Sequence, residues 1–183
     1  MQTFLSGFFR DPRRVGSAIP SSRALARALV DGLDLAHARV VVEVGPGTGA
    51  VTEELLRRVA PGTRVILVEL HPPFVEHLRE KYPEVEILHA DASDLPGLAR
   101  QHGFAGCDAV LSGLPLANFP KETTDAILGG ISAILAPGGR FTMFNYLGTT
   151  YSAVRRVFAA TRVRYVLWNI PPAFVYASIK QDR

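Results

Sequence analysis

The stretch VVVEVGPGTGAVTEEL, residues 40–55, combines a strand, a turn and a helix start. A run of mostly β-branched residues leads into a turn with three glycines, Gly45, Gly47 and Gly49, and a helical pattern follows. Glycines permit a tight turn and let a ligand approach the backbone, and the helix start offers free N–H groups. The spacing to Ala50 also satisfies the dinucleotide pattern G-x-G-x-x-G/A, which is a weak signal when it stands alone.

Three carboxylates add to this signal. Glu43 lies two residues before the first glycine, so we expect its carboxylate to face the loop and to receive a cationic amine. Glu69 ends the next strand-like run about 20 residues past the loop, where an acid binds ribose hydroxyls; the alternative is a solvated acid at a strand end. Asp91, followed by the small Ala92, suits an adenine amino group, whereas helix capping is expected of Ser93.

The rest of the chain alternates short apolar runs with helical stretches. Strands are predicted at 40–44, 64–70, 85–90, 108–113, 139–146, 162–168 and 173–180, and helices at about 20–31, 50–60, 72–82, 94–102, 120–135 and 149–160. Such alternation predicts a parallel sheet with helices on both faces. The link NIPP, residues 169–172, is too short for a parallel crossover, so the last two strands should form an antiparallel hairpin. The sequence therefore predicts a seven-stranded α/β fold in which the last strand is reversed.

Length and charge narrow the class of protein. The 183 residues suffice for one α/β domain, and no apolar run approaches the roughly 18 residues that span a bilayer. The start does not have the pattern of a secretory signal, and the single Cys107 fits a reducing cytosol. Residues 1–30 hold five arginines and one aspartate (net +4), 151–183 hold six basic and one acidic residue (net +5), and 31–150 hold nine basic and fifteen acidic residues (net −6). Basic ends suggest an anionic partner, either a lipid surface or nucleic acid, although surface arginines also serve solubility.

Four motifs resemble the class I S-adenosylmethionine-dependent methyltransferases: EVGPGTG at 43–49, VEL at 68–70, HADA at 89–92 and SGLPL at 112–116. The resemblance covers about residues 38–180 and implies a Rossmann-like seven-stranded sheet with an antiparallel last strand. It implies S-adenosylmethionine as cofactor and S-adenosylhomocysteine as product. The cofactor-binding residues that it implies are Glu43, Gly45, Pro46, Gly47, Thr48, Gly49, Glu69, Leu70, Asp91, Ala92 and Ser112. A dehydrogenase fits less well, because this length leaves no room for a substrate domain.

The loop SGLPLANFP, residues 112–120, bears on the acceptor. It is similar to the loop of amino-group methyltransferases that act on nucleic-acid bases, but Leu116 replaces the aromatic residue that stacks on the base, and a leucine offers no π-face. Residues 2–5 also look like the opening of the ribosomal RNA adenine dimethyltransferases. That family carries a further C-terminal helical domain, whereas this chain ends with the seventh strand. Methylation of an RNA base is therefore the alternative interpretation.

The opening FLSGFFRDPRRVGSAIPSS, residues 4–22, and NIPPAFV, residues 169–175, resemble the bacterial phospholipid N-methyltransferases. This implies methylation of phosphatidylethanolamine toward phosphatidylcholine. Such an amine must lose a proton before it can attack, and burial lowers its pKa from near ~10.4. The groups that could orient the amine are Ser112, the carbonyl of Leu114, Asn145 and Tyr146. No metal site is expected, because the histidines are scattered and His71 and His77 should lie on an exposed helix.

Residues 2–14 are predicted to form an amphipathic helix. Phe4, Leu5, Phe8 and Phe9 fall on one stripe, followed by Arg10, Arg13 and Arg14, of which Arg13 or Arg14 could bind the lipid phosphate. This helix could lie in the interface of an anionic membrane, or pack as a lid over the cofactor. We thus expect one domain, 1–183, with membrane-binding or lid helices at 1–30 and a catalytic core at 38–180. We expect a monomer on the inner face of the cell membrane, with phospholipid and not nucleic acid as partner.

Overall fold

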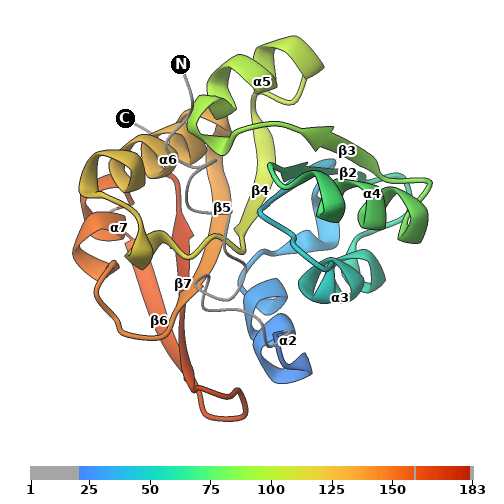
Figure 1. Ribbon diagram of the computed structural model, residues 1–183. Helices are drawn as coiled ribbons and strands as arrows, with labels where there is room; N and C mark the ends of the chain where they lie inside the picture. The colour runs from blue at the N-terminus through green and yellow to red at the C-terminus, as the bar shows by residue number, and fades with distance from the viewer. Residues whose placement is uncertain (1–20, 159, 182–183) are drawn as a thin grey trace.

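The computed structural model describes residues 21–158 and 160–181, and within them seven strands form one sheet (Figure 1). The strand order is β3-β2-β1-β4-β5-β7-β6. The strands are β1 (Val40–Val44), β2 (Arg64–Glu69), β3 (Glu86–His89), β4 (Cys107–Ser112), β5 (Leu135–Asn145), β6 (Ala160–Val166) and β7 (Ala173–Ile179). The first five run parallel, and β7 is antiparallel to both β5 and β6. The predicted sheet and its reversed last strand are confirmed.

Helices cover both faces of this sheet (Figure 1). They are α2 (Arg23–Asp31), α3 (Ala50–Arg58), α4 (Pro72–Lys81), α5 (Leu95–His102), α6 (Lys121–Ile134) and α7 (Tyr151–Val157), with short 3-10 turns η1 (Leu35–His37), η2 (Ala92–Asp94) and η3 (Leu116–Asn118). Among the described residues, no helix has the length and apolar character that crossing a membrane requires. The predicted helix at residues 2–14 lies outside the described residues.

Side-chain alternation along the strands divides the core into two layers. On β1, Val42 and Val44 enter the cluster beneath α5, α6 and α7, whereas Val41 enters the cluster beneath α2, α3 and α4. Because both faces are buried, the strands read as nearly continuous apolar runs. Glu43 points to the same side as Val41, so a carboxylate lies within an apolar layer.

The observed boundaries differ most from the prediction at the start of β5 and between the last helix and β6. β5 begins at Leu135 and not at 139, because Leu135 already pairs with Cys107 before an irregularity shifts the register to Arg140 opposite Ala109. The residues between, APGG, look like a turn in sequence. The last helix is shorter than predicted, Tyr151–Val157, and β6 begins at Ala160. The residues of β6, several of them β-branched, pair with β7 along its full length. This pairing outweighs the helical sequence pattern that continues to residue 160.

Candidate functional site

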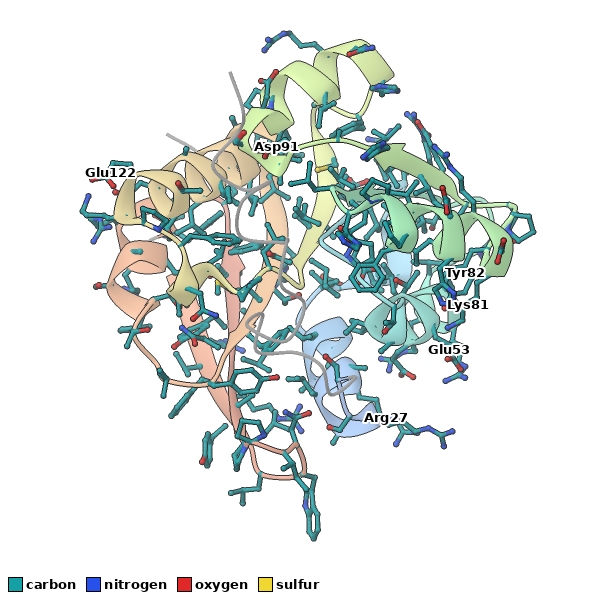
Figure 2. All side chains as sticks on the ribbon, viewed as in Figure 1. Arg27, Glu53, Lys81, Tyr82, Asp91 and Glu122 are labelled. Carbon is teal, nitrogen blue, oxygen red and sulfur yellow. The ribbon has the colours of Figure 1, made fainter. Side chains whose placement is uncertain are left out.

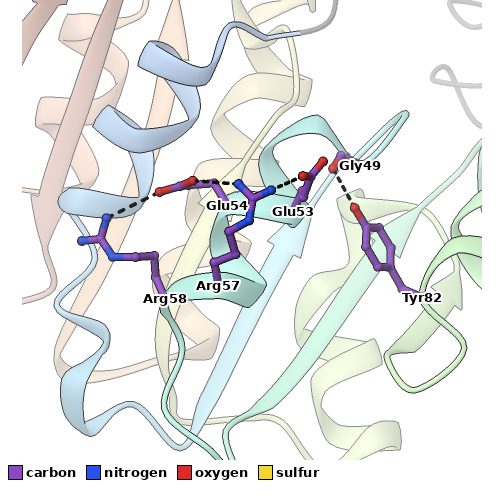
Figure 3. A network of polar contacts seen from close by, with 6 residues as sticks. All are labelled: Gly49, Glu53, Glu54, Arg57, Arg58 and Tyr82. Atoms are coloured by element: carbon purple, nitrogen blue, oxygen red, sulfur yellow. Dashed lines mark hydrogen bonds and ion pairs between the residues drawn. The ribbon is translucent and has the colours of Figure 1, made fainter.

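The glycine loop between β1 and α3 has the left-handed backbone that glycines permit. Gly45, Gly47 and Gly49 have φ angles of 70°, 56° and 76°. The amide of Gly45 donates to Val68 O at 2.9 Å, and the Tyr82 hydroxyl donates to the carbonyl of Gly49 at 3.1 Å (Figure 3). The loop is therefore fixed from β2 on one side and from the end of α4 on the other.

The loop after β4 lies directly on the glycine loop. A Cβ on Gly113 would meet the carbonyl oxygen of Gly45 at 2.4 Å, and a Cβ on Gly45 would meet the Leu114 side chain at 2.5 Å. A glycine at position 113 is therefore needed for the two backbones to approach this closely, and at Gly45 the absence of a Cβ leaves room for the Leu114 side chain. At Gly47, in contrast, a Cβ would have no neighbour within 4 Å, so this part of the loop faces open space.

Glu69 connects the glycine loop to the loop after β2. Its Oε2 accepts from the amide of Gly47 at 3.0 Å, and its Oε1 accepts from the amides of Leu70 and His71, each at 2.9 Å. The side chain is buried. A carboxylate has about four acceptor positions, so three backbone bonds leave one for a ligand hydroxyl.

A small cavity opens beside Glu69 at the carboxyl ends of β1, β2 and β4. It is lined by Gly45, Val68, Glu69, Leu70, Ala90, Ala92 and Leu114. Five of these residues belong to the predicted sites, so the structure brings them together. In open α/β sheets, ligands bind at this edge.

Asp91 stands next to this cavity, after β3 and before α5 (Figure 2). Its Oδ1 accepts from the amide of Ser93 at 2.8 Å, so the cap falls on Asp91 and not on Ser93 as predicted. A side chain that follows a strand and precedes a turn is placed to reach the first free amides. The other oxygen, Oδ2, is buried and accepts no hydrogen bond within the described residues. A buried acceptor of this kind fits an exocyclic amine, so the residues fit the nucleoside part of S-adenosylmethionine.

Glu43 is buried behind the glycine loop. Its Oε2 accepts from the Thr52 hydroxyl of α3 at 2.7 Å, and it does not line the cavity beside Glu69. Burial raises the pKa of its carboxyl to about 7, opposed by the hydrogen bond from Thr52 and assisted by the charge of Glu69. The predicted role of Glu43 in receiving the cofactor amine stays a prediction.

The residues after β5 are already engaged with one another. The amide nitrogen of Asn145 donates to the hydroxyls of Thr150 at 2.8 Å and Thr149 at 3.4 Å, and its oxygen accepts from the amide of Leu147 at 3.2 Å. Asn145 thus shapes this loop with both of its N–H groups, and its oxygen keeps one acceptor position. Its predicted role in orienting the amine stays a prediction. Half-buried Tyr146 packs edge-on against Phe144. Burial raises the pKa of its phenol, and a hydrogen bond with Asn169 partly offsets this rise.

Ser112 and Leu114 end β4 beside the glycine loop. The Ser112 hydroxyl is buried and accepts from the amide of Leu114 at 3.3 Å, which leaves its proton free to be donated. Leu116 and Phe119, farther along the same loop, are buried in the core cluster beneath α6. The described loop therefore holds no exposed aromatic ring on which a base could stack.

Several features of this edge carry no clear signal in the sequence. A hollow of about 370 Å³ lies between η3, α6 and α7. It is lined by Leu116, Ala117, Phe119, Lys121, Thr124, Asp125, Thr149, Thr150, Ser152, Ala153 and Arg156.

His71 precedes α4 and is half-buried, with its Nδ1 buried and without a hydrogen-bond partner among the described residues. Its predicted place on an exposed helix is therefore wrong. The sequence also does not predict the hydrogen bond between Ser22 and the buried Asn169, because the two residues lie 147 positions apart.

No group of three or more His, Cys, Asp or Glu residues that could hold a metal ion occurs within residues 21–158 and 160–181.

Comparison with known proteins points to one chemistry. Residues 41–139 match the family described as a methyltransferase domain. An ornithine lipid N-methyltransferase from Singulisphaera acidiphila is 36% identical over 177 residues, which cover 94% of this chain and 92% of that protein. A ribosomal RNA small subunit methyltransferase A from Dehalococcoides mccartyi is 40% identical over 73 residues, 38% of this chain and only 24% of that protein.

Solved structures share the fold. TrmN from Thermus thermophilus has a TM-score of 0.69 at 24% identity, over 85% of this chain and 48% of that one. The Burkholderia thailandensis 1,6-didemethyltoxoflavin-N1-methyltransferase, solved with 1,6-didemethyltoxoflavin and S-adenosylhomocysteine bound, has a TM-score of 0.65 at 22% identity, over 87% and 79% of the two chains. At these identities the likeness supports the fold alone.

Proposed function

Because this chain belongs to the S-adenosylmethionine-dependent methyltransferase family, we propose that it transfers methyl groups to the amine of a membrane lipid. The observation that carries the proposal is the similarity to an ornithine lipid N-methyltransferase along nearly the whole of both chains. A match of that extent includes the loops after β4 and β5, where an acceptor would lie. By contrast, the similarity to the ribosomal RNA enzymes covers less than half of this chain.

Phosphatidylethanolamine is the acceptor that we propose first, with phosphatidylcholine as the final product. The opening residues 4–22 and the segment 169–175 support it by their resemblance to phospholipid N-methyltransferases. Ornithine lipid, named in the relative, also offers a primary amine. The shared chemistry is a primary amine in a lipid head group at a membrane surface, and the experiment below separates the two lipids.

The protein's own residues have a limited set of tasks in this reaction. When bound, S-adenosylmethionine supplies an electrophilic methyl group on a sulfonium ion. We assign its ribose to Glu69, its adenine to Asp91 and its methionine part to the glycine loop and Glu43. The chain must also hold the acceptor nitrogen in line and exclude water. The groups that could hold the amine there are Ser112, the carbonyl of Leu114, the side-chain oxygen of Asn145 and Tyr146.

Deprotonation of the amine needs no strong base. An ethanolamine-like ammonium has a pKa near ~10 in water, and its positive charge is disfavoured where water is excluded. The groups at the end of β4 are neutral: the Ser112 hydroxyl and the carbonyls beside it. They accept hydrogen bonds from a neutral amine without stabilising the ammonium as a carboxylate would.

Methylation of adenine in RNA is the second candidate, favoured by the partial similarity to the ribosomal RNA enzymes. Against it stands the loop after β4, in which Leu116 and Phe119 are buried. We also propose that the protein lies on the inner face of the cell membrane as a monomer. Residues 2–14, the predicted anchor or lid with its lipid-binding side chains, lie outside the described residues.

The test is methyl transfer from labelled S-adenosylmethionine by the purified chain. Vesicles should contain phosphatidylglycerol with either phosphatidylethanolamine or ornithine lipid, and ribosomal RNA should be offered in a parallel reaction. We expect label in mono-, di- and trimethylated phosphatidylethanolamine. Label in ornithine lipid alone would identify that lipid as the acceptor in place of phosphatidylethanolamine, and the proposal of a lipid amine would stand. Label in RNA with none in either lipid would overturn the proposal.

A further inference from the structure

The turn between β6 and β7 exposes large apolar side chains. Leu167, Trp168 and Ile170 are 67%, 85% and 79% exposed, and Leu147, in the loop after β5, is 75% exposed. Within the described residues these four are the most exposed large apolar side chains, and we call them the apolar tip. The turn projects beyond the body of the protein (Figure 1). Scattered exposed apolar residues are ordinary, but four of them on neighbouring loops indicate a contact surface.

The apolar tip lies at the edge of the sheet where the candidate site lies. β7 is antiparallel to both β5 and β6, so β6 runs in the direction of β5 and ends at the same edge. In the register, Phe174 pairs with Asn145 of β5 and with Tyr165 of β6. Leu147 and the turn 167–172 therefore follow directly beyond the last paired residues. The carboxyl ends of β1 and β4, with the glycine loop, share this edge.

Hydrogen bonds fix the backbone of the turn while its apolar side chains remain outside. Buried Asn169 donates to the carbonyl of Pro171 at 2.7 Å and accepts from the amide of Ser22 at 3.0 Å. The Ser22 hydroxyl donates to the carbonyl of Trp168 at 2.7 Å. At the base of the turn, the rings of Tyr165 and Phe174 pack together with their centroids 4.8 Å apart. The exposure of Trp168 and Ile170 is thus a feature of a fixed backbone conformation.

The charge around the apolar tip suits an anionic surface. Residues 146–181 contain no acidic residue, and four arginines precede the turn in sequence: Arg155 and Arg156 of α7, and Arg162 and Arg164 of β6. The remaining basic residue, Lys180, lies at the other end of β7, where its Nζ donates to the carbonyl of Leu135. The four arginines are exposed. Arg156 of α7 also pairs with Asp125 of α6, and Arg164 of β6 pairs with Asp31 of α2, at exposed positions where such pairs are weak. A tryptophan among aliphatic residues, at the end of a strand that carries the exposed Arg162 and Arg164, matches the interface of an anionic bilayer, where indole rings partition and arginines meet lipid phosphates.

We propose that the apolar tip inserts into the interface of an anionic lipid bilayer and sets the catalytic edge of the sheet against the membrane. The inference rests on the proposed lipid acceptor for its purpose, but it concerns a separate contact. With the tip inserted, the ends of β4 and β5 face the head groups. A lipid amine could then reach the site without leaving the bilayer.

Trp168 is the only tryptophan in the chain, so its emission reports on the tip directly. The full chain should be mixed with vesicles of phosphatidylglycerol and phosphatidylcholine, which present no primary amine. We expect a blue shift of the emission, quenching by lipids brominated on the acyl chains, and weaker binding as salt rises. In the double variant Leu167→Ser/Ile170→Ser, the vesicle partition coefficient should fall at least about tenfold.

Val163→Ser is the matched control, because Val163 is 46% exposed on β6 away from the turn. It should change partitioning by less than about twofold, since it removes a scattered exposed side chain. Unaltered S-adenosylhomocysteine binding by calorimetry shows that each variant is folded. Vesicle flotation with unchanged Trp168 emission would overturn the proposal, as would absence of flotation.

Two further outcomes would assign the tip to another occupant and overturn the proposal. One is a blue shift that grows with protein concentration without vesicles, which would indicate a second copy. The other is emission that is blue without lipid and moves to the red when residues 2–14 are deleted. Insertion of Trp168 without methyl transfer to any lipid would support the proposed membrane insertion of the apolar tip and refute only the proposed lipid acceptor.

Discussion

At the scale of single residues, buried Glu43 should make the stability of the fold depend on pH. Burial raises the pKa of its carboxyl from 4.5 to about 7, and unfolding restores the ordinary value. The folded state therefore keeps a proton that the unfolded chain releases. This contribution to stability is fully present below pH 4.5 and is lost as the pH rises through 7. Glu43→Gln cannot ionise, so its stability lacks this pH dependence. We expect the stability of the variant minus that of the wild type to be more favourable at pH 8 than at pH 5, by up to about 3 kcal/mol.

Urea unfolding of both proteins at the two pH values measures this difference. Glu122→Gln is the control, because it removes the same charge from an exposed position on α6 (Figure 2). Because Glu122 lies in the first turn of α6, the control should lose up to about 1 kcal/mol, with a change between the two pH values of less than about 0.5 kcal/mol. A stability gap between Glu43→Gln and the wild type that does not change with pH would contradict the burial argument.

The sequence indicates residue identities in the site better than residue contacts. The spacing around Glu69 and Asp91 places both acids at the ends of neighbouring parallel strands, and the structure puts them there. It does not reveal that the Asn145 amide donates both of its hydrogens within the loop it belongs to, or that Gly113 touches Gly45. Such contacts depend on how two loops meet, which no local pattern determines.

At the scale of elements, the β6–β7 hairpin is coupled to α2 through Asn169. Its side chain bridges the Ser22 amide, at the cap of α2, and the Pro171 carbonyl within the turn. Asn169→Ala leaves both groups without their partner in a part-buried place, so we expect a loss of about 1–3 kcal/mol in the free energy of unfolding. Urea unfolding checks this, and the anisotropy of Trp168 emission should fall because the turn loosens.

The exposed Asn118 on η3 offers the comparison. Asn118→Ala should alter stability by less than about 0.5 kcal/mol, since the change lies at the surface. Equal effects of the two substitutions would mean that the bridge between α2 and the hairpin adds nothing to stability.

Most elements follow from the sequence because their apolar periods are clear and their ends carry glycine or proline. The alternation of strands and helices predicts the parallel part of the sheet, and the short NIPP link predicts the reversed hairpin. The position of β7 between β5 and β6 does not follow from either pattern. An antiparallel hairpin could add to the sheet through either of its strands, and burial decides: β7 has mostly buried residues, whereas β6 has four successive exposed ones.

At the scale of the whole molecule, the cofactor and the fold should stabilise each other. A ligand that binds only the folded chain stabilises it by about 2.7 kcal/mol at a hundred times its dissociation constant. For a chain of this size that corresponds to a rise in melting temperature of about 5–10 °C. We expect S-adenosylhomocysteine to produce such a rise and NADH to produce none, as measured by thermal unfolding.

Asp91 provides the sharpest form of this prediction. Asp91→Asn can keep an oxygen that accepts from the Ser93 amide, but it replaces the buried, unpartnered Oδ2 with an NH₂ group. That group cannot accept a hydrogen bond from the adenine amino group, so the rise should shrink while the melting temperature without ligand changes little. Asp94→Asn makes the same change at the aspartate that caps α5 through the Gly97 amide, and it should retain the full rise. If both variants kept the full rise, Asp91 would not bind the adenine, and its buried oxygen would need another explanation.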